Sequence, residues 1–226
     1  MDTLRKHEVF EIEALEKLKN KGFLTPLVFI GGTMLRLCYE LSRYSTDLDF
    51  WFVRRTNQKA YFNKLKSYLG EFYEVTDAKL KFNSMLLEIR SKDYPKRLKI
   101  EIRKELKGCD TQERIAFSKY STSQVVLRVI TLEEAMKYKI KAALDRKDIR
   151  DFFDIEFLLR QGIGLSRKKA ELSALKSILN SFKENEYKVA LGSLLDADTR
   201  KYYIKNRFSY LLSKIEKLRD SFPLIK

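Results

Sequence analysis

The sequence is poor in the residue types that build metal clusters, disulfide frameworks and flexible linkers. Its 226 residues include only 2 cysteines, 1 histidine, 3 prolines and 8 glycines. Cys38 and Cys109 lack metal-ligand spacing and His7 has no second imidazole beside it, so we expect neither a structural zinc site nor a disulfide framework. No apolar run approaches the roughly 20 residues that span a bilayer, and the first residues lack a signal-peptide core. We therefore expect a cytoplasmic protein with no membrane partner.

Positive charge, by contrast, is abundant. The 46 Lys and Arg residues outnumber the 31 Asp and Glu residues, which gives a formal net charge of +15. Residues 1–130 carry a net charge of +8 and residues 131–226 carry +7, so the surplus is not a basic tail. Such a surplus favours an anionic partner, such as a nucleic acid or a nucleotide. Lysine-rich solvated helix faces would give the same count, and charge alone does not choose between the two interpretations.

Hydrophobic periodicity divides the chain into a mixed α/β part and a helical part. From Thr131 onward nearly every segment has helical character, and Thr131 with Glu134 has the sequence form of a capping box. We therefore expect an α/β domain over residues 1–130 and a helical domain over residues 131–226, with no flexible linker between them. In the first part, strands are predicted at 26–30, 47–53, 71–75, 85–90 and 98–103, and helices at 9–22, 33–41 and 57–70.

Two adjacent glycines, Gly31 and Gly32, separate the predicted strand 26–30 from the helix that follows. Glycine permits unusual backbone angles and lets a ligand approach the main chain closely. The unpaired N–H groups and the dipole at the start of a helix favour phosphate, and Thr33 adds a hydroxyl at that point. The alternative is a simple Gly-Gly turn with no ligand.

Asp47 and Asp49 lie two residues apart in a predicted strand. Residues at i and i+2 of a strand project to the same face, so the two carboxylates point together and Leu48 points into the core. Like charges side by side are tolerable when a divalent cation lies between them, and Mg²⁺ prefers one or two carboxylates together with phosphate oxygens. The alternative is a pair of acids that are solvated or paired with Arg36 or Arg43.

A third carboxylate would complete such a metal site. In the predicted strand 98–103, Glu101 lies on the face opposite Leu98 and Ile100, beside Lys99 and Arg103. Glu88, in the predicted strand 85–90, is the competing candidate. Either residue could instead belong to a solvated face of the sheet.

These motifs together resemble a known family. The order Gly-Gly-Thr (31–33), Leu-Arg-Leu (35–37), Arg-Tyr-Ser (43–45) and Asp-Leu-Asp-Phe (47–50) is similar to the first motif of nucleotidyltransferases with the polymerase-β-type fold. In particular, the chain resembles the AbiEii/AbiGii toxins of type IV toxin–antitoxin systems, over roughly residues 29 to 160. The resemblance implies an α+β fold, a mixed sheet with flanking helices, followed by a C-terminal helical lobe.

The resemblance also points to residues beyond the first motif. In that family a helix lysine is followed by an Arg-Asp-x-x-Asp segment, which corresponds here to Lys139 and residues 150–154. Lys139, Arg146 and Arg150 are thereby expected to bind the triphosphate, and Asp154, or less directly Asp151, to orient them. Asp154 also lies one turn from Arg150, where an ordinary helix ion pair would form. We expect Lys139 to be dispensable for folding, because a buried structural lysine is rare.

The implied activity is Mg²⁺-dependent transfer of a nucleotide from an NTP to an RNA, with tRNA the expected acceptor and a cognate antitoxin as a further partner. Asp47, Asp49 and Glu101 would hold the metal ions, with Glu101 assisting deprotonation of the attacking hydroxyl. The alternatives are a non-catalytic basic RNA- or partner-binding protein on the same fold, and transfer to a small molecule or a protein. The expected triphosphate-binding residues are Gly31, Gly32, Thr33, Arg36, Lys139, Arg146 and Arg150.

Overall fold

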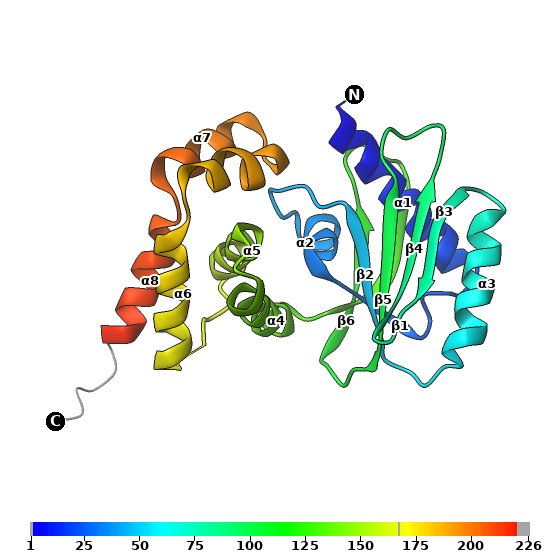
Figure 1. Cartoon of the computed structure of the whole chain (residues 1–226), viewed down its shortest axis with the longest axis horizontal. Helices are drawn as coiled ribbons and strands as arrows, with labels where there is room; N and C mark the ends of the chain where they lie inside the picture. Colours follow the sequence, from blue (N-terminus) through cyan, green and yellow to red (C-terminus); the bar gives the residue numbers. More distant parts are fainter. Residues whose placement is uncertain (1, 167, 221–226) are drawn as a thin grey trace. The chain divides into compact units, whose positions relative to one another are not determined.

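The computed structural model describes residues 2–166 and 168–220, and the chain divides into two compact units, Met1–Thr131 and Leu132–Lys226. The first unit is built on a seven-stranded sheet with the strand order β3-β4-β5-β2-β1-β7-β6 (Figure 1). Its strands are β1 (Leu27–Ile30), β2 (Asp47–Phe52), β3 (Glu74–Leu80), β4 (Ser84–Arg90), β5 (Leu98–Leu106), β6 (Thr111–Phe117) and β7 (Gln124–Ile130).

The sheet is mixed. β2 pairs in parallel with β5, and β1 pairs in parallel with β7, while the other neighbouring strands are antiparallel. β1 lies near the middle of the sheet, and all four of its residues are buried. This agrees with its sequence, because a continuous apolar run suits a strand that is covered on both faces. The predicted α+β fold is confirmed.

Three helices pack on this sheet: α1 (Thr3–Asn20), α2 (Gly31–Tyr39) and α3 (Gln58–Gly70). α3 runs beside β3 and β4 (Figure 1), and the ring of its Tyr61 contacts Phe52 of β2. The buried face of β2 therefore points toward α3. α2 packs against β2 and β6, and it begins directly after β1.

The expectations for this unit differ from the structure in several places. α1 begins at Thr3 rather than at residue 9, and β6 and β7 were not predicted from the sequence. β3 begins at Glu74 rather than at residue 71, because the N–H groups of Phe72 and Tyr73 donate to the carbonyl of Leu69 and prolong the end of α3. α2 begins at Gly31 rather than at residue 33, so the two glycines are its first residues and not a loop before it. The turn after β1 and the start of α2 therefore fall on the same two residues, Gly31 and Gly32.

Every element of the second unit within the described residues 132–166 and 168–220 is a helix, as its sequence predicts. Its first two helices are joined by a short turn, and Asp148 caps the second by accepting a hydrogen bond from the N–H of Arg150. Its elements are α4 (Leu132–Arg146), α5 (Ile149–Arg160), α6 (Lys169–Ser181), η1 (Glu186–Leu191), η2 (Gly192–Leu194), α7 (Ala197–Asn206) and α8 (Ser209–Asp220).

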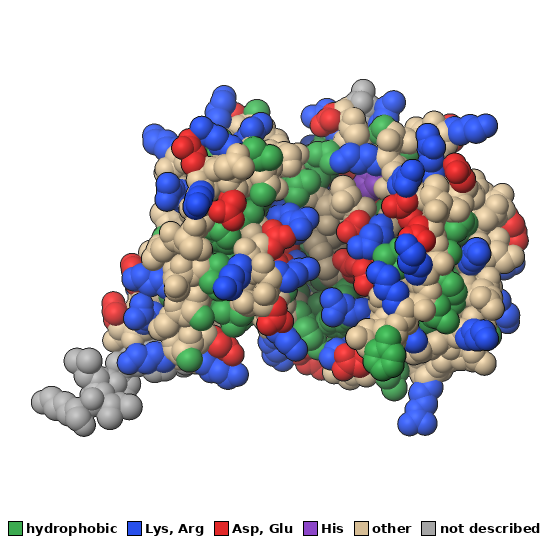
Figure 2. Space-filling view, in the orientation of Figure 1, with side chains coloured by type: hydrophobic (Ala, Val, Ile, Leu, Met, Phe, Trp, Pro, Cys, Tyr) green, Lys and Arg blue, Asp and Glu red, His purple; other side chains and the backbone are tan. Residues whose placement is uncertain are grey.

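Basic side chains are spread over both units, with acidic side chains among them (Figure 2). This distribution agrees with the similar net charges of the two parts of the sequence. Among the described residues, no helix has the length and apolar character needed to cross a membrane.

Candidate active site

Asp47 and Asp49 lie on the same face of β2 and are partly exposed. Leu48 and Phe50 lie on the other face and are almost completely buried. The strand alternation thus places both carboxylates together, as the sequence predicts. Asp49 is paired in register with Ile30, the last residue of β1, so it stands where β1 turns into α2.

Glu101, rather than Glu88, lies next to the aspartates. In the parallel pairing of β2 with β5, Asp49 stands opposite Glu101 and Asp47 stands opposite Lys99. Glu88 lies on β4, one strand further from the aspartates, where it stands opposite Lys99 of β5. Its Oε1 atom accepts hydrogen bonds from Thr76 and Arg97. Strand register thus decides between the two candidates that the sequence leaves open.

The ammonium of Lys99 lies between the carboxylates of this acidic face, which we define as Asp47, Asp49, Lys99 and Glu101. Its Nζ atom is 3.2 Å from Oε2 of Glu101 and 3.6 Å from Oδ2 of Asp47. Burial alone would lower the pKa of Lys99, but the charges of Asp47 and Glu101 outweigh it and raise the pKa. Burial would raise the pKa of Glu101, and the Lys99 ammonium lowers it instead.

The acidic face fits a hard divalent cation in its chemistry. Its donors are carboxylate oxygens, and two carboxylates completed by phosphate oxygens are sufficient for Mg²⁺. Among residues 2–166 and 168–220, however, no three His, Cys, Asp or Glu side chains converge closely enough to hold a metal ion. Asp47 and Asp49 share one face of β2, and the ammonium of Lys99 contacts Asp47 as well as Glu101.

Gly31 is required by the geometry of the turn between β1 and α2. Its φ of +84° lies in the left-handed region that favours glycine, and a Cβ at this position would lie 2.9 Å from Oδ2 of Asp49. A Cβ at Gly32 would lie 2.5 Å from Nη2 of Arg43 and 2.9 Å from Oγ of Ser45. The start of α2 is thus in close contact with polar side chains.

Thr33 differs from its sequence-based expectation. Its side chain is fully buried, and its hydroxyl donates a 2.6 Å hydrogen bond to the carbonyl of Asp47. The hydroxyl therefore ties α2 to the first residue of β2. Arg36 is also engaged, since its guanidinium donates to Glu8 and to the carbonyl of Leu41.

A buried polar cluster on α1 supports the segment before Asp47. His7 and Glu11 are almost fully buried, and Nε2 of His7 lies 3.0 Å from the carbonyl oxygen of Thr46 and 3.6 Å from Oε1 of Glu11. Burial lowers the pKa of His7. Burial also raises the pKa of Glu11 well above its ordinary value, with Glu8 and Asp47 adding to the effect. Neither carboxylate oxygen of Glu11 has a hydrogen-bond partner within the described residues.

In the second unit, Lys139 of α4 is held by two acids of α5. Its Nζ atom lies 2.6 Å from Oδ2 of Asp154 and 3.2 Å from Oδ1 of Asp151. The side chain of Lys139 is only 12% exposed and that of Asp154 is fully buried. These contacts argue against the expectation that Lys139 is dispensable for folding, because its removal would leave two buried carboxylates with one fewer cation.

The two arginines of this region have separate partners. Arg146 donates two 2.8 Å hydrogen bonds from Nη2 to the carboxylate of Asp151. Arg150 pairs with Asp148, the cap of its own helix. Asp154 thus contacts Lys139, which is one of the roles that the sequence leaves open for it.

Two residues near the carboxylates were not among the expected site residues. Lys99 could have been noticed, because it lies two residues before Glu101 and so on the same face of a strand. Arg43 is almost completely buried, although it lies in a polar segment. Its position against Gly32 depends on tertiary packing, for which the sequence gives no local signal.

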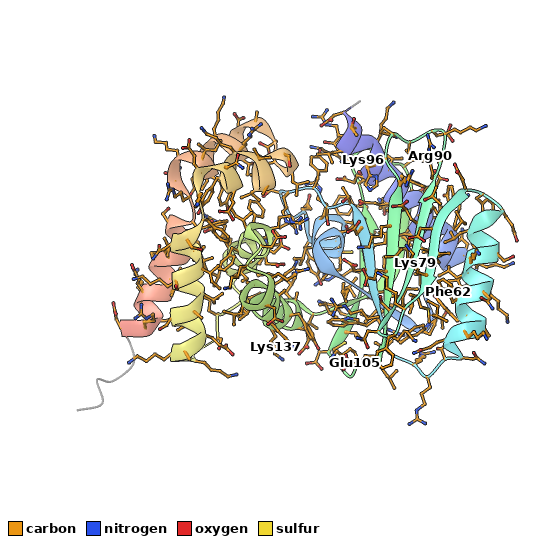
Figure 3. All side chains as sticks on the ribbon, viewed as in Figure 1. Phe62, Lys79, Arg90, Lys96, Glu105 and Lys137 are labelled. Carbon is orange, nitrogen blue, oxygen red and sulfur yellow. The ribbon has the colours of Figure 1, made fainter. Side chains whose placement is uncertain are left out.

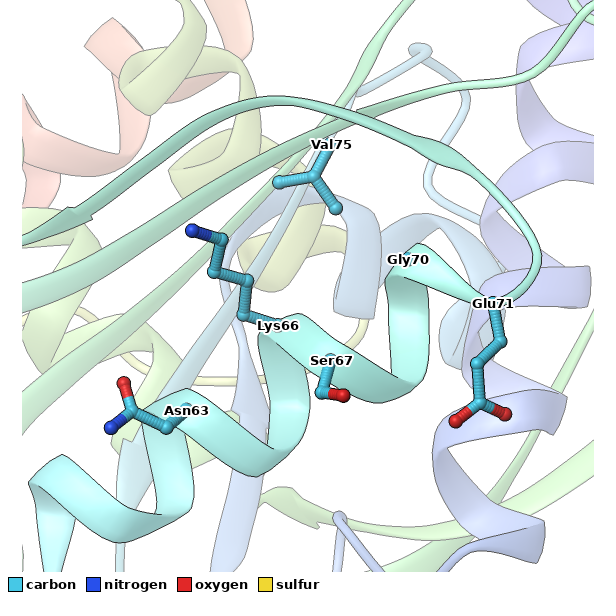
Figure 4. A pocket seen from close by; sticks show the side chains of 6 residues that line it. All are labelled: Asn63, Lys66, Ser67, Gly70, Glu71 and Val75. Carbon is cyan, nitrogen blue, oxygen red and sulfur yellow. The ribbon is translucent and has the colours of Figure 1, made fainter.

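A surface hollow along α3 (Figure 4) is separate from the acidic face. It contains one cation, Lys66, and one carboxylate, Glu71, and it lacks the paired acids that phosphate chemistry needs. Its lining residues are Asn63, Lys66, Ser67, Gly70, Glu71 and Val75.

Comparison with known proteins gives one family and a shared fold. The family model described as "Nucleotidyl transferase AbiEii toxin, Type IV TA system" matches residues 13–213. Among solved structures, JHP933 from Helicobacter pylori is similar with a TM-score of 0.53 and 22% identity, over 98% of this chain and 97% of that one. A candidate nucleotidyltransferase from H. pylori gives a TM-score of 0.53 and 21% identity, over 96% and 97%. No curated protein sequence matches the chain.

Proposed function

The chain belongs to the AbiEii nucleotidyl transferase toxin family of type IV toxin–antitoxin systems, and we propose that it transfers a nucleotide from an NTP to an RNA, with a tRNA as the acceptor. In this reaction an acceptor hydroxyl attacks the α-phosphorus, a new P–O bond forms, and the bond to pyrophosphate breaks. A general base accepts the proton of the attacking hydroxyl. The observation that carries the proposal is the pair Asp47 and Asp49 beside the glycine start of α2.

The carboxylates and the helix start serve different parts of the substrate. Asp47 and Asp49 would hold the divalent cation, and bound Mg²⁺ would supply positive charge against the phosphates and the reacting oxygens. The N–H groups of Gly31 and Gly32 lie in the first turn of α2, which is where an anionic phosphate is favoured. Thr33 acts by fixing the main chain at Asp47, through its hydrogen bond to that carbonyl.

Glu101 is the proposed acceptor of the hydroxyl proton. It stands opposite Asp49 on the neighbouring strand, and its pKa is lowered by Lys99, so it is ionised and able to take a proton at neutral pH. The sequence suggests Arg36 as a triphosphate ligand. Its contacts weaken that assignment, because its guanidinium donates hydrogen bonds to Glu8 and to the carbonyl of Leu41. Arg43 lies against Gly32, but it is buried and its guanidinium donates to the carbonyl of Tyr44.

The second unit contributes a preorganised cation. Asp151 and Asp154 fix the ammonium of Lys139 in position, so little side-chain freedom is lost when it meets the triphosphate. Arg146 is more exposed than Lys139 and is available for a second phosphate contact. Arg150 keeps a half-exposed guanidinium beside Asp148.

An RNA acceptor is supported by the net charge of +15 and by the spread of basic side chains over both units (Figure 2). A small-molecule or protein acceptor is the main alternative within the enzyme class. The alternative outside the enzyme class is a non-catalytic protein that binds RNA or an antitoxin. The Asp47–Asp49 pair argues against this alternative, because a binding surface has no need of adjacent carboxylates.

The proposal is tested by incubating the pure protein with each of the four α-labelled NTPs, Mg²⁺ and total tRNA. We expect label in the tRNA band with one or two of the nucleotides. A parallel reaction with the protein alone, and one with a protein-free small-molecule extract, detect the alternative acceptors. If no reaction incorporates label while labelled RNA still binds to the protein, the non-catalytic alternative is the correct one.

A further inference from the structure

We propose that the hairpin between β3 and β4 is a docking site for a single-stranded segment of the acceptor RNA, with the ring of Phe82 stacking on a base and the cations beside it binding phosphates. This inference rests on the proposed function, because that function supplies RNA as the ligand. It names a surface that would hold the acceptor beside the carboxylates of β2.

The first step is the exposure of the hairpin tip. Phe82 is 92% exposed, and it lies in a turn closed by a 2.8 Å hydrogen bond from the N–H of Lys81 to the carbonyl of Ser84. Turns favour Gly, Pro, Asn, Asp and Ser, so neither the turn nor the core accounts for a phenylalanine at this position. Leu80 and Leu106, which end β3 and β5 at the same end of the sheet, are 43% and 48% exposed. An exposed ring in such surroundings offers a face on which a base can stack.

The second step is the positive charge around the ring. Lys81 precedes Phe82 and is exposed. The ammonium of Lys104 donates a 3.1 Å hydrogen bond to the carbonyl of Lys81, so a second cation lies next to the turn. Arg103 is exposed and stands opposite Ser84, the residue that closes the turn. Phosphates of a nucleic acid are the groups that such a set of cations attracts.

Two acids near the hairpin do not cancel this charge. Asp77 is ion-paired with Lys79 of the same strand (labelled in Figure 3), and Glu105 is ion-paired with Lys107. Each acid is therefore balanced by its own lysine. The charges of Lys81, Lys104 and Arg103 remain as a local surplus.

The third step is the position of the hairpin relative to the carboxylates. Residues that stand opposite one another in neighbouring strands point to the same face of the sheet. One such row crosses β2, β5, β4 and β3 through Asp49, Glu101, Leu86 and Lys79. The row spans three strand spacings, about 14 Å, and Lys81 follows Lys79 by two residues on the same face. A short stretch of RNA could therefore reach both the aspartates and Phe82, which favours RNA over other anionic partners.

The experiment measures RNA binding without catalysis. A fluorescein-labelled single-stranded RNA oligonucleotide is titrated with the full chain in EDTA and without NTP, and fluorescence anisotropy gives the Kd at several salt concentrations. We expect Phe82→Ala to weaken binding by about 5- to 150-fold, the range for loss of one base stack, and to leave the salt dependence unchanged. Lys81→Gln should lower the slope of log K against log salt by about 0.7, because one phosphate contact is lost. Phe82→Trp should bind like wild type.

Two matched controls address other exposed residues of the same kinds. Phe72→Ala removes a half-exposed phenylalanine that has an ammonium, that of Lys17, over its ring, in the segment before β3. Lys64→Gln removes an exposed lysine from α3, which packs on the opposite face of the sheet. Both variants should bind the oligonucleotide like wild type. In the transfer assay, Phe82→Ala should raise the KM for RNA and leave the KM for NTP unchanged.

The outcomes separate this inference from the proposed function. Wild-type affinity in folded Phe82→Ala and Lys81→Gln would overturn the inference and leave the RNA acceptor standing. Binding to anionic lipid vesicles that Phe82→Ala abolishes, with its RNA affinity unchanged, would overturn the inference in favour of a membrane surface. RNA binding that depends on Phe82, in a chain that transfers no nucleotide, would support the inference and overturn the proposed transfer. No RNA binding by the wild type would overturn the RNA acceptor and the inference together.

Discussion

The Nζ atom of Lys139 lies 2.6 Å from Oδ2 of Asp154, whose side chain is fully buried, while that of Lys139 is 12% exposed. The pair joins α4 to α5, and Asp151 extends it on the other side of the ammonium. A residue that is proposed to meet the substrate therefore also neutralises two buried carboxylates. Its catalytic and structural contributions need to be measured separately.

We expect Lys139→Met to abolish nucleotide transfer and to lower the free energy of unfolding by up to about 3–5 kcal/mol, because it removes the ammonium that the buried carboxylates of Asp151 and Asp154 share, while Arg146 still pairs with Asp151. The double variant Lys139→Met, Asp154→Asn should regain part of the stability and none of the activity. Urea unfolding and the transfer assay measure the two effects.

The matched control is Lys137→Met on the same helix (labelled in Figure 3), whose side chain is 68% exposed and pairs with Glu134. It should change the stability by about 0–1 kcal/mol. Recovery of activity together with stability in the double variant would show that Lys139 is only structural.

Gly31→Ala should impair both stability and catalysis. The left-handed backbone at this position costs a non-glycine residue about 1–2 kcal/mol, and the new Cβ would displace the carboxylate of Asp49. We expect transfer to fall by about 10- to 100-fold, as for other small misplacements of reacting groups.

Gly162→Ala separates the two causes, because Gly162 has a φ of +87° but no atom within 4 Å of the added Cβ. It should lose similar stability and keep its activity. Equal activity losses in the two variants would mean that backbone strain, and not the contact with Asp49, is responsible.

The buried carboxyl of Glu11 should make the stability of the protein depend on pH. Its folded-state pKa is raised well above the ordinary 4.5, because burial disfavours the charge and Glu8 and Asp47 oppose it more than Arg36 favours it. Below that ordinary pKa both states hold the proton, and the stabilisation by the neutral carboxyl is complete. As the pH rises, the unfolded chain releases the proton that the folded chain keeps, so stability is lost.

We therefore expect Glu11→Gln, which cannot ionise, to have a smaller loss of stability than wild type between about pH 5 and about pH 8. Denaturant unfolding across this range gives the comparison. Burial lowers the pKa of the neighbouring His7 below its ordinary value. Parallel pH profiles for the two proteins would show that Glu11 is ionised in the folded state.

The part of the site that lies within one strand could be predicted from the sequence. The two-residue period of a strand puts Asp47 and Asp49 on one face, and the apolar residues between them identify that strand. The choice between Glu88 and Glu101 could not be predicted, because it depends on which strand pairs with β2 and in what register. Lys99 was visible beside Glu101, but its contact with Asp47 depends on the same pairing.

The helical unit illustrates the same limit. Helical spacing predicts α4 and α5, yet the burial of Lys139 depends on how the two helices are rotated against each other, which local sequence does not specify. The role of Thr33 was missed for a related reason. Its hydroxyl is directed to the carbonyl of Asp47 by the packing of α2 on β2.

The transfer of labelled nucleotide to RNA by Asp49→Asn, compared with wild type, tests the central claim most directly. The neutral amide keeps the shape of the side chain but cannot replace a metal-binding carboxylate, so transfer should fall by about a hundredfold or more. Asp77→Asn, which removes a carboxylate from edge strand β3, should transfer at the wild-type rate. The melting temperature of Asp49→Asn should match or exceed that of wild type, because repulsion from Asp47 is relieved. Wild-type transfer by folded Asp49→Asn would contradict the assignment of the acidic face as the active site.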